Sequence, residues 1–257
     1  MKIKRLVIVT DCVDIAANEL RASIINELGD NKDIEIEPFV PVHEFSVVNC
    51  NFALRLMADI YPSGTLFSVI FNPSKERPKS LIGKTERKGF IFMGRNTGAF
   101  DWLTRDFGCK ELYDASGLFT DLSKQFLSFS GKLVTAPTIA KVAHGEDIKK
   151  IGTLVSSEEI TRLDIADYTI VHIDNFGMMK FTGNLDNVQE NDLYEVEINE
   201  IKIKAIFCKR MMSQETGSWV IFPGSSFGLL ELGRVREYGA SSIGAKIGDI
   251  IEFKKIS

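Results

Sequence analysis

Residues 64–79, GTLFSVIFNPSKERPK, decide the fold class. They contain a continuous run of Leu, Phe, Val and Ile that stops at Asn72-Pro73 and continues into a charged loop. An apolar run between turn signals predicts a strand buried on both faces, which is typical of a parallel sheet covered by helices. Because ligands bind outside the carboxyl ends of such strands, we expect Asn72 to border any chemical site.

The segments around this strand predict further alternation of strands and helices. Residues 3–10 (IKRLVIVT) predict a strand, and Asp14 and Gly29 supply the start and stop signals of a following helix. Ser46 is the expected N-cap of a second helix. The other elements expected in this part of the chain are strands over residues 34–40 and 89–94 and helices over 99–106 and 136–143. We therefore predict an N-terminal layered α/β domain over residues 1–155, with a mostly parallel sheet flanked by helices.

The periodicity changes after a polar stretch, residues 156–167, which we interpret as a linker. Residues 169–174, 194–208 and 217–222 alternate apolar and polar side chains, as antiparallel strands exposed on one face do. Turn signals separate these runs. The prediction for residues 168–257 is a small all-β, barrel-like domain.

Composition narrows the function classes. The 257 residues include 44% hydrophobic and 26% charged side chains and carry a formal net charge of -4, which gives no general attraction to nucleic acid or to an anionic membrane. No stretch approaches the length of a membrane span, and we expect no signal peptide before the first strand. The four cysteines and three histidines show no metal-ligand spacing. We expect a cytoplasmic protein without metal, nucleic-acid or membrane partners.

Three predicted strands end in polar residues, namely Thr10-Asp11, Asn72-Pro73 and Arg95-Asn96-Thr97. In a parallel sheet these ends lie along one edge, which favours a small-molecule site there. The Asp11 carboxylate can accept hydrogen bonds from two hydroxyls, such as those of a ribose. The alternative is that Asp and Asn cap turns at strand ends.

Several short motifs, in order along the chain, resemble one family. Thr10-Asp11 with Asp14 and Arg21 resembles its opening TD(F)…D…K segment, and Asn72-Pro73 resembles its DPGVG loop. The further matches are residues 96–98 with DNG, 129–137 with FHGRDxFAP, 173–177 with IDxFGN, and 224–231 with GSxGxLEI. Together these segments resemble the S-adenosylmethionine (SAM) hydroxide adenosyltransferase family, the SAM hydrolases related to fluorinase and chlorinase.

The resemblance implies a homotrimer with sites between the first domain of one subunit and the β-domain of the next. It implies that water displaces methionine from C5′ of SAM, with no cofactor, and that SAM, adenosine or a related nucleoside is the ligand. The ligand-binding positions that it implies are Asp11, Phe45, Asn96, Asp174, Phe176, Ser225 and Ser226.

The family's water-activating residues are replaced in this chain. Asn72 stands where the family has Asp, Ser130 where it has His, and Arg77 or Lys79 where it has Arg. Asn cannot ionise, and losing a positioned general base typically lowers a rate about 10²- to 10⁴-fold. Four interpretations follow: slow SAM hydrolysis oriented by Asn72, Arg77 and Ser130; adenosyl transfer to a halide or other anion; a catalytically silent nucleoside-binding protein; or a structural trimer.

Overall fold

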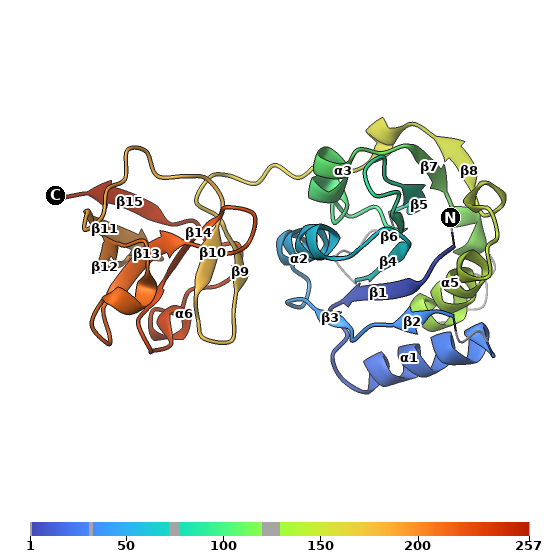
Figure 1. Cartoon of the computed structure of the whole chain (residues 1–257), viewed down its shortest axis with the longest axis horizontal. Coiled ribbons are helices and arrows are strands. Elements are labelled where there is room, and N and C mark those ends of the chain that lie inside the picture. Colours follow the sequence, from blue (N-terminus) through green and yellow to red (C-terminus); the bar gives the residue numbers. More distant parts are fainter. Residues whose placement is uncertain (1, 31–32, 72–77, 120–128, 257) are drawn as a thin grey trace. The chain divides into compact units, whose positions relative to one another are not determined.

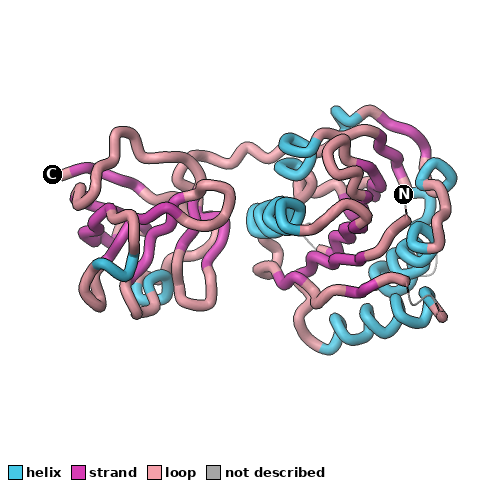
Figure 2. The backbone as a smooth tube through the Cα atoms, viewed as in Figure 1, coloured by secondary structure: helices cyan, strands magenta, loops and turns pink. Residues whose placement is uncertain are grey.

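The computed structural model describes residues 2–30, 33–71, 78–119 and 129–256. The chain divides into two compact units, Met1–Leu163 and Asp164–Ser257. The division falls within the range that the sequence suggests as a linker. Each unit is built around its own sheet (Figures 1 and 2), so the protein has an α/β fold with one layered unit and one β unit.

The sheet of the first unit is mixed. Its order is β2-β1-β4-β6-β5-β7-β8, with β3 also pairing with β1. The pairs among β1, β2, β3, β4 and β6 are parallel, whereas the pairs β6–β5, β5–β7 and β7–β8 are antiparallel. The strands are β1 (Arg5–Thr10), β2 (Glu35–Ile36), β3 (Val40–Pro41), β4 (Thr65–Ile70), β5 (Ser80–Lys84), β6 (Ile91–Arg95), β7 (Glu111–Asp114) and β8 (Thr153–Val155).

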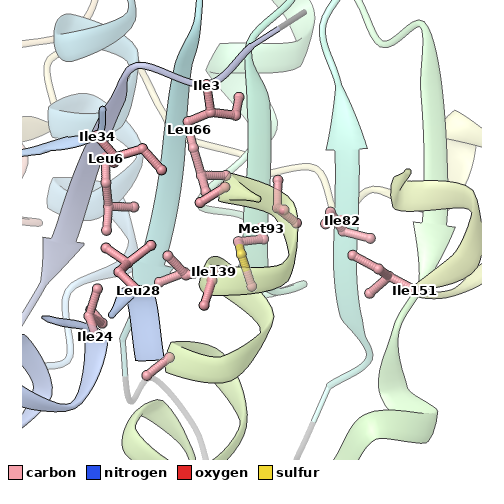
Figure 3. Packing of buried hydrophobic residues seen from close by; sticks show 14 of the residues in the cluster. Ile3, Leu6, Ile24, Leu28, Ile34, Leu66, Ile82, Met93, Ile139 and Ile151 are labelled. Carbon is pink, nitrogen blue, oxygen red and sulfur yellow. The ribbon is translucent and has the colours of Figure 1, made fainter. Parts of the chain in front are cut away.

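Helices cover both faces of this sheet (Figure 1). On one face Leu20, Ile24 and Ile139 pack with strand residues such as Leu66 and Met93, as Figure 3 shows in part. The other face packs against α2 and α3. The α-helices are α1 (Ile15–Leu28), α2 (Val47–Ile60), α3 (Asp101–Phe107) and α5 (Ala136–Ala143), and short turns are η1 (Ser116–Phe119), η2 (Gly131–Thr135), η3 (Ile148–Lys150) and η4 (Ser157–Glu159). Burial on both faces explains why the β4 run is continuously apolar.

The predicted caps are confirmed. Asp14 Oδ1 accepts a hydrogen bond from the Ala16 amide at the start of α1, and Ser46 Oγ accepts from Asn49 at the start of α2. Gly29 ends α1 with a φ of 56°. The predicted strand over residues 34–40 is wrong in detail, because two short strands, β2 and β3, pair with β1 instead of one.

The second unit is a curled sheet in the order β15-β11-β12-β13-β14-β10-β9. A bridge between Thr169 and Ile250 joins its two ends, so the sheet approaches a barrel. One pair, β12 with β13, is parallel, where antiparallel strands were expected. The elements are β9 (Ile170–Ile173), β10 (Met179–Phe181), β11 (Leu193–Ile198), β12 (Ile201–Phe207), η5 (Met211–Ser213), β13 (Trp219–Pro223), β14 (Leu230–Arg234), α6 (Gly239–Ser242) and β15 (Glu252–Lys255).

No helix in the described ranges is long and apolar enough to cross a membrane.

Candidate functional site

The carboxyl end of β1 brings two predicted ligand residues together. The Phe45 amide donates to Asp11 Oδ2 at 3.5 Å. Phe45 has a φ of 57° and is 67% exposed, so its ring is not part of the core. A bulky residue in the left-handed region carries backbone strain, which is often found at functional sites. Asp11 and Phe45 are therefore neighbours at the carboxyl end of β1 through the Phe45 backbone, and the Phe45 ring is exposed.

The same sheet edge continues at β4. Thr10 lies opposite Ile70, and Phe71 follows β4. The predicted catalytic residues Asn72 and Arg77 come next in the chain and lie outside the described residues. Their roles stay predictions.

Ser130 lies at the start of η2, a π-helical segment that leads into α5. Its hydroxyl makes no capping hydrogen bond, and Phe129 before it has a φ of 63°. Single π-turns occur frequently at functional sites, and a positive φ at a bulky residue is a second sign of a constrained backbone. The backbone at Ser130 is thus unusual, and Ser130 lines a cavity together with Ile70 and Phe71 at the carboxyl end of β4, where the sequence predicts a site.

A cavity of about 60 Å³ lies beneath Ser130, which is enough for at least one water molecule. Ser80 at the start of β5 lines the same cavity. Ser80 is 4% exposed, and its Oγ has no hydrogen-bond partner among the described residues. Buried hydroxyls without partners are rare in native structures, so the cavity offers hydrogen-bonding capacity to a small guest.

The lining of this cavity carries no carboxylate or imidazole among the described residues. Its polar side chains are Ser80, Arg95, Ser130, Thr135 and Thr138. The Arg95 guanidinium donates to the Pro78 carbonyl at 3.2 Å. The described wall therefore supplies hydrogen-bond donors and a positive charge but no general base.

Asn96 is engaged elsewhere. Its Nδ2 donates to the Glu159 carbonyl at 2.7 Å, and its Oδ1 accepts from the Thr161 amide at 2.9 Å. These bonds fasten the end of η4 and the loop after it to the end of β6. They give Asn96 a structural role, and its predicted ligand contact stays untested.

The second unit contains a pocket of about 600 Å³, within the usual range for small-molecule sites. Three predicted ligand residues, Asp174, Phe176 and Ser225, line it, whereas Ser226 is 4% exposed and does not. Much of the wall is apolar or aromatic. The remaining lining residues are Met178, Lys180, Met211, Met212, Phe222, Pro223, Gly224, Glu231, Arg236, Glu237 and Tyr238.

The turn after β9 positions the first wall. Asp174 Oδ1 accepts from the amides of Phe176 and Met178, both at 2.9 Å. Gly177 has a φ of 79°, and its carbonyl accepts from the Ala240 amide at 3.0 Å. A Cβ at Gly177 would lie 2.9 Å from Gly239 N, so only glycine lets the two loops approach this closely.

A row of directly opposed residues crosses β9, β10, β14 and β13, and those on β10, β14 and β13 line the pocket and form what we call its floor. His172 lies opposite Lys180, Lys180 opposite Glu231, and Glu231 opposite Phe222. Directly opposed residues on neighbouring strands share one face of the sheet. Lys180 and Glu231 form an ion pair, with side chains 11% and 7% exposed.

Burial lowers the pKa of His172 below its usual value, and the positive charge of Lys180 adds to this shift against the pull of Asp174. The imidazole is thus held towards its neutral form beside the ion pair.

The sequence did not single out Lys180, Ser80 or Tyr238. The signal that could have indicated Lys180 is its place as a lysine between the apolar residues Met179 and Phe181. Lysine is almost never fully buried unless it is paired. The described residues contain no group of three or more His, Cys, Asp or Glu side chains that could hold a metal ion.

No known family model matches the chain, and no curated protein matches it. Solved structures are similar over almost its whole length. An uncharacterized conserved protein from Thermotoga maritima is 19% identical with a TM-score of 0.79, covering 97% of this chain and 100% of that one. A conserved hypothetical protein from Thermus thermophilus is 18% identical with a TM-score of 0.73, covering 99% and 100%. At these identities the likeness shows the shared two-unit fold alone.

Proposed function

We propose that this protein binds a nucleoside or adenosyl compound, such as adenosine or SAM, as the sequence resemblance implies. The observation that supports it most is the pocket of the second unit. Asp174 and Phe176 reach it from the turn after β9, and Ser225 reaches it from the turn after β13. Three residues chosen from sequence in two separate segments thus share one pocket of suitable size.

The chemistry of the pocket fits such a ligand. Phe176 is 61% exposed and Tyr238 66% exposed at its wall, and both are open to contact with a planar base. Asp174, Ser225 and the ion pair supply polar groups among apolar side chains, which is the usual composition of a small-molecule site.

A second candidate concerns turnover. The cavity beneath Ser130 offers hydroxyl donors and Arg95 without a base among its described lining residues. Such a lining suits an anion, which needs no deprotonation, better than it suits activation of water. Adenosyl transfer to a halide is therefore the alternative to slow SAM hydrolysis that this cavity favours.

Calorimetric titration of the purified protein with adenosine and with SAM tests binding. Incubation with SAM, with and without chloride or fluoride, followed by chromatography for adenosine, methionine and 5′-halo-adenosine tests turnover. Binding without product supports a silent nucleoside-binding protein. The absence of both binding and product contradicts the proposal and leaves the structural-trimer interpretation.

Substitutions of two exposed aromatic residues, compared with a control elsewhere in the second unit, test whether the pocket is the binding site. Phe176→Ala and Tyr238→Ala remove pocket wall but little core, so we expect weaker binding with small changes in stability. Ile250→Ala is the control, because Ile250 is 53% exposed in the same unit and does not line the pocket.

A further inference from the structure

The ion pair of Lys180 and Glu231 is the feature of the second-unit pocket that packing alone explains least. Burying two charges requires removing their water, and apolar residues of similar size often stabilise a protein as well or better. Both side chains are nevertheless nine-tenths buried or close to it, and both line the pocket.

The pair retains unused hydrogen-bonding capacity. An ammonium carries three donors and a carboxylate two acceptor oxygens. Among the described residues, the hydrogen bond of this pair runs from Lys180 Nζ to Glu231 Oε1, and neither side chain has another polar partner there. The remaining donors of Lys180 and the second oxygen of Glu231 are left for groups in the pocket.

The surroundings keep this polar floor uncovered. Gly224 packs so closely that a Cβ would collide with Glu231 Oε1, and Gly233 leaves room for the Met178 thioether. A side chain at Gly224 would cover the carboxylate. Glycine at position 224 therefore leaves the Glu231 carboxylate uncovered on this side.

We infer that Lys180 and Glu231 recognise the edge of a planar heterocycle that presents a hydrogen-bond acceptor beside a donor. Lys180 donates to the acceptor, and Glu231 accepts from the donor. This inference rests on the proposed nucleoside binding and specifies which edge of the base the pocket recognises. An acceptor beside an amino group, as on the six-membered ring of adenine, has this pattern.

The apolar part of the pocket wall suits a planar ring. Phe176, Phe222 and Tyr238 supply aromatic surface, and methionines at η5 supply thioethers, while Arg236 and Glu237 add charged groups to the lining. A ring can bury its faces against the aromatic side chains, a contact that a free amino-acid group does not make. Free methionine is accordingly the counter-probe.

The test compares ligands on the unaltered full-length protein. Adenosine and purine riboside differ in the 6-amino donor, so calorimetry on both measures what Glu231 adds. A hydrogen bond to a charged group predicts about 10- to 100-fold tighter binding of adenosine. Equal affinities for the two nucleosides, or tighter binding of methionine than of adenosine, would overturn the inference and leave nucleoside binding intact.

A paired variant gives the second arm. Lys180→Met with Glu231→Leu removes both charges together and avoids leaving one unpaired. We expect this variant to bind adenosine and purine riboside equally, and both more weakly than the wild-type protein binds purine riboside, because the Lys180 donor is lost as well. Lys202→Met is the control. Lys202 Nζ forms an ion pair with Glu197 Oε2 at 3.3 Å, and Lys202 does not line the pocket, so this variant should keep the preference for adenosine. A preference retained in the double variant would refute the role of the pair.

Failure of the wider proposal looks different. If the wild-type protein binds neither nucleoside, the proposed function fails, and the inference fails with it. Binding of both without discrimination contradicts only the assignment of Lys180 and Glu231.

Discussion

Removing one member of the buried ion pair should destabilise the second unit far more than removing both. In Lys180→Met the Glu231 carboxylate, 7% exposed, loses its cation and its hydrogen bond. Breaking a buried pair typically costs about 3–5 kcal/mol. Because the pair borders a pocket, we expect the lower end, about 3 kcal/mol in the free energy of unfolding. The double variant Lys180→Met, Glu231→Leu should lie within about 1 kcal/mol of wild type.

Urea unfolding followed by tryptophan fluorescence measures these energies. The chain has two tryptophans, one in each unit, so a Trp102→Phe background leaves Trp219 on β13 as the reporter for the second unit. Wild type, Lys180→Met, Glu231→Leu and the double variant form a double-mutant cycle, which gives the coupling energy between the two side chains. Additive losses in the double variant, or a loss below about 1 kcal/mol in Lys180→Met, would refute the description of the pair as buried and coupled.

The same variant has a titration readout. The charge of Lys180 helps to lower the pKa of His172, so Lys180→Met should raise that pKa, measured from the imidazole signals by NMR. In the folded wild type the lowered pKa means that stability is lost as pH falls below the usual histidine value. The variant should lose less stability over that acid range.

Three further predictions concern stability and reactivity. Gly177→Ala should weaken ligand binding and lower Tm more than Gly248→Ala does. Both glycines have a positive φ, but of the two only Gly177 would place a Cβ within 3 Å of backbone atoms. Equal effects of the two substitutions would contradict the close loop packing at Gly177. Lys88→Met should cost about 1–2 kcal/mol in thermal unfolding, because Lys88 Nζ donates to the carbonyls of Ala58 and Asp59 in the last turn of α2 and of Tyr61 at its C-cap, at 2.8–3.0 Å. An unchanged Tm would contradict this capping role. Burial raises the pKa of Cys109 to about 11, so its alkylation at pH 8 should be slow until the protein unfolds, as peptide mass mapping would detect.

Local signals in the sequence account for much of the first unit. The strand β4 lies where the apolar run predicts it, and α5 has the bounds of the predicted helix over residues 136–143. Asp14 and Ser46 cap their helices through the expected side-chain hydrogen bonds. These features depend on residues within one turn of one another, and sequence patterns report such interactions directly.

Features that depend on distant partners were missed. The strand β5 follows the charged loop, and no local sequence signal predicts it. Its position is set by its antiparallel pairing with β6 and β7. The cavity beneath Ser130 needs Ser80 from that strand, so it was not predictable either. The pairing of β12 with β13 is parallel because the connecting segment returns the chain to the same direction, which alternation cannot reveal.

The site was predicted unevenly for the same reason. Asp174, Phe176 and Ser225 sit on turns with recognisable motifs, and they share a pocket. Lys180 and Glu231 become neighbours only through the pairing of β10 with β14. Motifs therefore indicated the pocket's turns, and the sheet register supplied its charged floor.

Nucleoside binding in the second-unit pocket is tested most directly by calorimetric titration of the full-length protein with adenosine. We expect saturable one-site binding that Phe176→Ala weakens and Ile250→Ala leaves unchanged. No heat of binding with adenosine or SAM, by a protein that unfolds cooperatively, would contradict this central claim.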